Sequence, residues 1–519
     1  MDKVSVPDVG LPGRSWKTRV WKGVGSSALA QAIAATQAIL LVPFFLRAWG
    51  SDGYGHWITL TTLVSYLSLL DFGGQNYIGN LLAARHARGQ DVAFRKGLSE
   101  GVSFFVCLGL AVSVVLLISL LVAFKVPLPG LARPLVAWEV WVLALLGVNC
   151  LLLSIPGGVY VTAYRATGLF VRGAMMGNVV RVLGIGLSVG LLWASAGLEV
   201  YALSVLGTGL VLTSIIIWDT RRCIPECRSV DVSLAAGLRG STHLRGAIYF
   251  WLLALAQTVK QQGVILILAA AATPAVVSLY ATHRTIANIP GYFPVLVLGP
   301  LMPEFSFLWA QDRLSDLCRA TFSSIRIVVF MTGAAAIFLW LSSPLIYNVW
   351  TSGRFELEPL LLAVLLVQGV LAAGWATSAW SLLASNRNRS VAMWSLLNAA
   401  ITISLATFLV RKHGEIGVAV AGLIGDLVCG MAVFPALASA FLRVRTLRIY
   451  AEIGSGMLVL LTLLGVAMIV SVLLGGWLSV LAFMVVGAGL FRLIMFPAIG
   501  LADGGIRDVL RPLVVRLRS

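Results

Sequence analysis

Long apolar runs separated by short charged or glycine- and proline-containing breaks follow one another along the whole chain. Each run approaches or exceeds the roughly 20 residues that a helix needs to cross the hydrocarbon core of a bilayer. We therefore predict an all-α polytopic membrane protein with about 14 transmembrane helices. The predicted spans are 24–46, 55–78, 98–124, 138–163, 173–194, 198–218, 246–272, 276–302, 321–347, 357–383, 391–410, 416–441, 453–475 and 477–500.

The composition leaves little room for a large soluble domain. Hydrophobic residues make up 59% of the 519 residues and charged residues 11%, and the mean hydropathy is +0.94. The 38 Lys and Arg against 21 Asp and Glu give a net charge of +17, but cytoplasmic loops collect Lys and Arg, so this excess predicts no nucleic-acid partner. The connections are too short for the catalytic loop of a polymerase or another membrane enzyme. We expect a transporter with no catalytic residues.

The basic residues divide unevenly between the two sides of the membrane. If the spans cross alternately, 28 of the 38 Lys and Arg fall on the side that holds both termini, 6 fall on the other side and 4 lie within spans. Because cytoplasmic loops carry the excess of Lys and Arg, we predict that both termini are cytoplasmic.

The two halves of the chain repeat similar features at a similar distance. Tyr54 is matched by Tyr280, and Gln31 by Gln257, each 226 residues later. We therefore predict two six-helix lobes around a central cavity, followed by two extra helices, and such lobes can expose the cavity alternately to either side. The predicted divisions are an N-terminal arm at 1–23, an N-lobe at 24–218, a cytoplasmic linker at 219–245, a C-lobe at 246–441, helices 13 and 14 at 453–500, and a cytoplasmic tail at 501–519.

The hairpin predicted over 247–300 carries two cations near the middle of the membrane. Lys260 lies fourteen residues before Pro274 and Arg284 lies ten residues after it, which places both roughly 15 to 21 Å from the turn. A charge at this depth costs at least about 2.5 to 3.5 kcal/mol, and neither cation has a carboxylate partner on its own hairpin. We predict that both face a wet cavity and bind an anion, so that removing either would strand no opposite charge. The alternative is that they snorkel or pair with acids on other helices.

Polar residues near these two cations recur at helical spacing, which puts them on the same helix faces. The N-lobe contributes a basic residue of its own at mid-depth, with an asparagine three residues earlier. The predicted substrate-binding residues are Gln257, Lys260 and Gln261 on the first helix of the hairpin, Tyr280, Arg284 and Asn288 on the second, and Asn178 and Arg181 in the N-lobe. Pro290 and Pro294 follow the second helix and predict a break or bend there.

Two acids inside spans are candidates for ion coupling. Asp426 lies near mid-depth of its span and is our candidate for a proton or sodium site, with an ion pair to a neighbouring arginine as the alternative. Asp71 lies nearer the inner face, where its alternative role is to cap a helix end. We expect no other cofactor. The pair Cys223 and Cys227 has no accompanying His or Cys pair, so we predict no metal site.

The segment 43–91 carries a recognisable set of short motifs. It holds Gly50, Tyr54-Gly55, Trp57, Asp71-Phe72-Gly73, Ala83-Ala84, Arg88-Gly89 and Asp91. With the fourteen spans and the two-lobe repeat, this set resembles the Wzx-type polysaccharide flippases of the multidrug/oligosaccharidyl-lipid/polysaccharide exporter superfamily. Trp49 and Gly74 depart from that pattern, which often has leucine at both positions.

The resemblance implies a protein of the bacterial inner membrane that moves an oligosaccharide linked to a polyprenyl pyrophosphate from the inner to the outer leaflet. The product would feed surface polysaccharide synthesis, such as O-antigen or exopolysaccharide, alongside a polymerase and other assembly proteins. A pyrophosphate that bridges Lys260 and Arg284 would satisfy both cations through charge-assisted hydrogen bonds. The alternative is a drug or metabolite antiporter of the same superfamily, although exporters of cationic compounds need acidic or aromatic cavities.

Overall fold

A computed structural model of the chain describes residues 15–123, 135–241, 248–385 and 387–474. Every regular element within these ranges is helical, which confirms the predicted fold class. The described residues of the predicted spans from 24–46 to 453–475 fall mostly on helices. The last predicted span, 477–500, lies outside the described residues.

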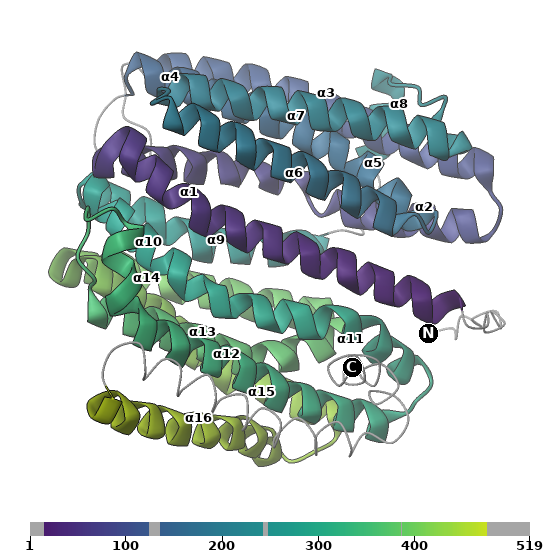
Figure 1. Cartoon of the computed structure of the whole chain (residues 1–519). Coiled ribbons are helices and arrows are strands. Elements are labelled where there is room, and N and C mark those ends of the chain that lie inside the picture. Colours follow the sequence, from purple (N-terminus) through teal and green to yellow (C-terminus); the bar gives the residue numbers. More distant parts are fainter. Residues whose placement is uncertain (1–14, 124–134, 242–247, 386, 475–519) are drawn as a thin grey trace.

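The N-terminal half forms one group of helices, drawn from purple to blue-teal in Figure 1. Short 3₁₀ or π-helical segments lie between several of these helices. The elements are α1 (Ser15–Leu67), η1 (Ser68–Asp71), α2 (Gly74–Ala87), α3 (Asp91–Ala123), α4 (Ala137–Val148), η2 (Asn149–Ser154), α5 (Ile155–Ala166), α6 (Phe170–Trp193), α7 (Leu198–Cys223), η3 (Pro225–Cys227) and α8 (Leu234–Gly240).

The C-terminal half forms the second group, drawn from teal to yellow-green. The predicted break at Pro290 is confirmed, because the helix ends at Asn288 and resumes at Tyr292. The elements are α9 (Ile248–Ala271), α10 (Pro274–Asn288), η5 (Ile289–Gly291), α11 (Tyr292–Ala310), α12 (Leu314–Trp350), α13 (Pro359–Ala384), α14 (Asn388–Gly425), η6 (Asp426–Met431), α15 (Ala432–Leu442) and α16 (Thr446–Leu474).

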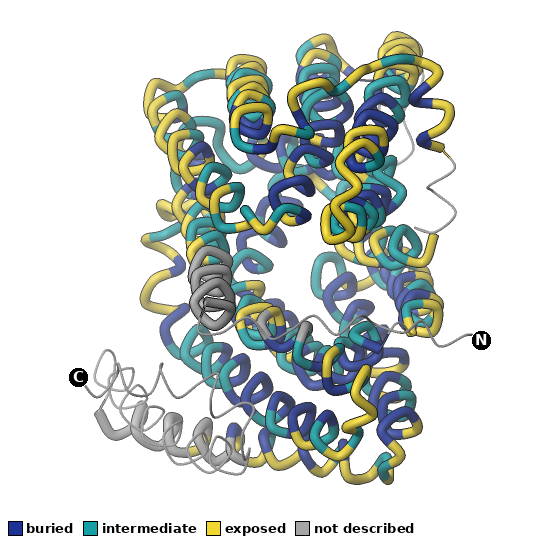
Figure 2. The backbone as a smooth tube through the Cα atoms, turned by 90° about the vertical axis from the view of Figure 1, so that its right-hand side faces the viewer, coloured by how far each residue is buried: buried dark blue, intermediate teal, exposed yellow. Residues whose placement is uncertain are grey.

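Each half of the described chain has its own buried hydrophobic clusters, and we call these halves the N-lobe and the C-lobe. The buried residues of two core clusters all lie between Leu41 and Cys227, and those of the other clusters all lie between Val264 and Leu460. Figure 2 shows buried positions inside each half and exposed positions at its periphery. Many exposed positions are apolar, for example Val115, Ile118 and Leu121 on α3. A helix surface of this kind suits hydrocarbon rather than water.

Two of the longest helices, α1 and α14, each contain a glycine at which the helix is interrupted. Gly50 within α1 has φ of 70° and Gly414 within α14 has φ of 53°, a left-handed conformation that glycine adopts without steric cost. Both fall between consecutive predicted spans. Ten helical stretches of the described chain are long and apolar enough to cross a membrane, fewer than the predicted spans partly because such stretches run through these two glycines.

The predicted linker carries the short helix α8, which packs against the N-lobe. Arg239 at the end of α8 pairs with Glu100 of α3, with Nε 3.3 Å from Oε1. The backbone of α8 approaches α3 so closely that a side chain on Gly240 would lie 2.4 Å from the carbonyl oxygen of Glu100. The linker is therefore fastened to the N-lobe.

The two lobes touch most closely where α9 turns into α10. A Cβ atom on Gly55 of α1 would lie 1.9 Å from the carbonyl oxygen of Pro274. Nearby, the hydroxyl of Ser278 donates to the carbonyl of Ser51 at 2.6 Å. Only a residue without a side chain allows this approach of two backbones, so Gly55 sets how closely the lobes meet.

We expect Gly55→Val to force the lobes apart at this contact and to lower the free energy of unfolding by about 1–3 kcal/mol through overpacking. Gly190→Val is the matched control, because a Cβ atom at Gly190 meets no neighbouring atom within 4 Å. The measurement is thermal unfolding of both purified variants in the same detergent. Equal unfolding temperatures for the two variants would show that the close contact at Gly55 is unimportant.

Candidate functional site

The ammonium group of Lys260 forms an ion pair with Asp426. It points into the C-lobe, where Nζ lies 2.5 Å from Oδ1 of Asp426. The Asp426 side chain is 1% exposed and that of Lys260 16%. The sequence left two arrangements open for Lys260, a wet cavity that binds an anion or a pair with an acid on another helix. The structure shows the pair. For Asp426 the alternative to an ion-coupling site was an ion pair with a neighbouring arginine, and the structure shows an ion pair with a lysine instead.

Two amide side chains complete the surroundings of the Asp426 carboxylate. The Nε2 group of Gln368 on α13 donates to Oδ2 at 3.0 Å, and the Nδ2 group of Asn398 on α14 donates to Oδ1 at 3.1 Å. The hydroxyl of Thr402 in turn donates to Oδ1 of Asn398 at 3.3 Å. Four segments of the C-lobe thus meet at one buried carboxylate, which receives hydrogen bonds from one ammonium group and two amides.

The local sequence around Asp426 makes room for this cluster. A Cβ atom at Gly425 would lie 2.3 Å from the hydroxyl oxygen of Thr402, and one at Gly422 would lie 2.7 Å from Nε2 of Gln368. Asp426 also begins the π-helical turn η6, a widened turn that often occurs at functional sites. The glycines and the π turn together allow polar side chains to reach the carboxylate between closely packed helices.

Trp375 of α13 lies beside the cation pair. The Nζ atom of Lys260 is 6.0 Å from the centre of its ring, a distance at which the negative face of an indole attracts a cation. The indole nitrogen is buried, and it makes no hydrogen bond within the described part of the chain. Trp375 therefore offers the ammonium group weak alternative stabilisation without competing for the carboxylate.

Arg284 has a different environment from Lys260. Its Nη1 atom donates to the carbonyl oxygen of Gln261 at 2.6 Å, so the side chain crosses from α10 to α9. Its side chain is partly exposed, and within the described chain no carboxylate contacts it. A guanidinium group has five N–H donors, which leaves several of them available to an anion.

The polar residues predicted beside these cations divide into two groups. Gln257, Gln261 and Asn288 are exposed, so they can contact a solute together with Arg284. Tyr280 is 4% exposed and packs in the core of the C-lobe. It therefore presents no surface to a substrate in this state.

The N-lobe candidates lie on α6. Asn178 is buried and Arg181 is exposed, with its Nη1 atom 3.4 Å from the carbonyl oxygen of Ala30 on α1. Asp71 accepts a hydrogen bond from the backbone N–H of Gln75 at 3.2 Å. The carboxylate of Asp71 thus caps the beginning of the following helix, α2, whereas the alternative role predicted for it was to cap the end of its own helix.

No pattern in the sequence indicated a role for His283, which precedes Arg284. Its Nδ1 atom lies 2.8 Å from the carbonyl oxygen of Leu279 and 2.9 Å from the hydroxyl of Tyr347, and its Nε2 atom accepts from the backbone N–H of Glu358 at 3.0 Å. These contacts are those of a neutral imidazole with the proton on Nδ1. His283 fixes α10, and therefore the origin of the Arg284 side chain, against α12 and the chain that leads into α13.

Within the described residues no cluster of His, Cys, Asp and Glu side chains could hold a metal ion. Cys227 in the linker is fully buried, and burial raises the pKa of its thiol to about 12. Since a thiolate is the form that binds metals, this cysteine is a poor ligand.

No protein-family model matches the sequence, and no curated protein sequence is significantly similar to it. Similarity appears instead among solved structures. The chain resembles a lipid II flippase, MurJ, in an inward closed conformation, with a TM-score of 0.69 and 13% identity over 91% of this chain and 99% of that one. It also resembles a multidrug resistance MATE family transporter of the MOP superfamily in an inward-facing conformation, with a TM-score of 0.64 and 16% identity over 80% and 95% of the chains.

A third similar structure is a MOP superfamily transporter from Pyrococcus furiosus, described as having a binding pocket of reverse polarity. The TM-score is 0.52 and the identity 15%, over 84% of this chain and 96% of that one. The similarity extends over nearly the full length of all three proteins. The chain therefore has the fold of the MATE and MurJ transporters of the MOP superfamily.

Proposed function

We propose that this protein is a flippase that moves a polyprenyl-pyrophosphate-linked oligosaccharide from the inner to the outer leaflet of a bacterial inner membrane, for surface or exopolysaccharide synthesis. The observation that carries the proposal is Arg284 of α10, a partly exposed guanidinium group with unused donors and no carboxylate partner in the described chain. Pyrophosphate matches the planar donor fork of arginine. The fold shared with a lipid II flippase is consistent with such a cargo.

The cluster around Asp426 makes export of a cationic drug the weaker alternative. A cationic compound needs an accessible negative charge, whereas Asp426 is 1% exposed and neutralised by Lys260. The exposed polar groups near it are amides and a guanidinium, on Gln257, Gln261 and Arg284. These groups suit the phosphate and hydroxyl groups of a lipid-linked glycan.

Lys260 and Asp426 suggest how transport is coupled to an ion. In our proposal the pyrophosphate draws the Lys260 ammonium away from Asp426, with which it shares a hydrogen bond in the present state. The buried carboxylate then takes up a proton or a sodium ion, because an unpaired charge in that position is costly. Asp71, which caps α2, has no comparable cationic partner among the described residues and is the weaker coupling candidate.

The experiment is translocation of a fluorescent polyprenyl-pyrophosphate oligosaccharide in proteoliposomes. Flippase activity should expose the glycan to a membrane-impermeant glycosidase at a rate well above that of protein-free vesicles. A cationic dye in the same vesicles tests the antiporter alternative. Dye transport without movement of the lipid-linked glycan would exclude the proposed function in favour of a drug antiporter.

A further inference from the structure

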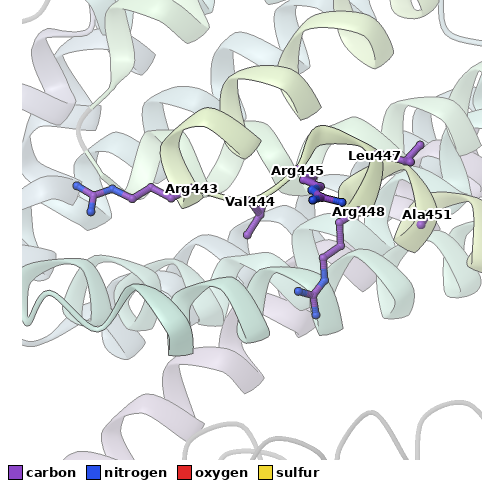
Figure 3. Close-up of a pocket in the computed structure, with 6 residues that line it drawn as sticks. All are labelled: Arg443, Val444, Arg445, Leu447, Arg448 and Ala451. Carbon is purple, nitrogen blue, oxygen red and sulfur yellow. The ribbon is translucent and has the colours of Figure 1, made fainter.

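A second basic region lies away from the lobe contact, at the turn between α15 and α16. A pocket of about 490 Å³ is lined there by Arg443, Val444, Arg445, Leu447, Arg448 and Ala451. Figure 3 shows Arg445 and Arg448 at the start of α16, with Arg443 extending along the turn in the other direction. The lining of the pocket therefore combines three guanidinium groups with three apolar side chains.

The charge of these arginines is not cancelled by neighbouring acids in the described chain. The nearest acid along α16, Glu452, is occupied by Arg326 of α12, whose Nη2 atom lies 2.9 Å from Oε1 while its Nε donates to the other oxygen. Arg448 instead rests over the ring of Phe322, 5.1 Å from its centre. This contact orients a guanidinium group and leaves its N–H donors free for an anion.

An apolar strip continues from the pocket along α16. Leu447, Ala451, Leu458 and Leu461 recur at the spacing of one helix face, and Leu447 is 77% exposed while Leu458 and Leu461 are each 64% exposed. The basic pocket lies at the first residues of a long apolar helix. A ligand that fits both parts has an anionic head and a hydrocarbon tail.

We propose that the pocket binds the headgroup of an anionic glycerophospholipid, with one acyl chain along the exposed face of α16. The phosphate would take charge-assisted hydrogen bonds from Arg445 and Arg448. Scattered interfacial arginines attract anionic lipids only through a diffuse field. Here the guanidinium groups share one pocket with Val444 and Leu447, which gives a headgroup a defined position.

The test compares phosphatidylglycerol with phosphatidylcholine, added to the full-length protein in detergent and counted as bound lipids by native mass spectrometry. The unmodified protein should retain phosphatidylglycerol and not phosphatidylcholine. Replacing Arg443, Arg445 and Arg448 together with glutamine should weaken that retention about tenfold or more. The matched control removes three exposed cations elsewhere, Arg88, Arg95 and Lys96, and should leave retention unchanged.

A second variant tests the site while all arginines stay in place. Leu447→Glu puts a negative charge into the pocket at a position that is 77% exposed, so it should fold and still lose phosphatidylglycerol. Unchanged retention in both pocket variants, an equal loss in the control, or equal retention of the two lipids would each overturn the proposal. Displacement of phosphatidylglycerol by inorganic phosphate alone would identify a site for free anions instead. None of these outcomes depends on transport activity.

Discussion

Replacing Lys260 with glutamine is expected to lower the free energy of unfolding by about 3–5 kcal/mol, the usual cost of removing one partner of a buried ion pair. The carboxylate of Asp426, 1% exposed, would keep the amide donors of Gln368 and Asn398 but lose its cation. Asp426→Asn should cost a similar amount, because it leaves the ammonium group unpaired. The sequence-based expectation that removing Lys260 strands no charge is therefore wrong.

The double variant with Lys260→Gln and Asp426→Asn should recover most of this loss, since two neutral amides can share the space of the ion pair. The measurement is a double-mutant cycle from thermal or denaturant unfolding in detergent. If the decrease in the free energy of unfolding of the double variant equals the sum of the two single decreases, the two residues are not coupled.

The same variants test the proposed coupling. If Lys260 contacts the pyrophosphate, the double variant should remain inactive in proteoliposomes although its fold is restored. If Asp426 is the coupling site, glycan movement by the unmodified protein should depend on a pH or sodium gradient, and Asp426→Asn should remove that dependence. Gradient-independent flipping by the unmodified protein would rule out coupling at this site.

Arg284→Gln is expected to reduce glycan translocation by about 100-fold or more while changing the free energy of unfolding by only about 1 kcal/mol. The stability change is small because the hydrogen-bond partner of Arg284 is a backbone carbonyl, that of Gln261, and no carboxylate is left unpaired. The loss of activity is large because an arginine fork bound to a phosphate contributes both charge and paired hydrogen bonds. Arg284→Lys keeps the charge without the fork and should restore only part of the activity.

The measurement combines translocation rates with unfolding temperatures for the two Arg284 variants and for Arg411→Gln. Arg411 is an exposed cation of the C-lobe near Gly414, and its replacement should affect neither property. Normal translocation by Arg284→Gln would remove this residue from the substrate site. A large loss of stability would assign it a structural role instead.

The membrane architecture could be predicted from the sequence because it depends on local properties. A span must be apolar over the thickness of the bilayer, so the runs of residues from 24–46 to 453–475 mark helices directly. Pro290 interrupts its helix because it lacks a backbone donor, and the structure breaks there. The separation of Lys260 and Arg284 from the turn also follows from helix geometry alone.

The partners of those cations were decided by the tertiary structure. Lys260 and Asp426 are 166 residues apart in the sequence, and helical periodicity shows which face a residue occupies but not which helix lies opposite. Asn398 and Gln368 are polar residues inside apolar runs of the sequence, a pattern that indicates a buried polar network. The pattern does not show that both side chains donate to Asp426. His283 likewise gained its role from Tyr347 and Glu358. An ion pair between distant helices depends on how the helices pack, so the sequence placed both charges in the membrane and only the fold brought them together.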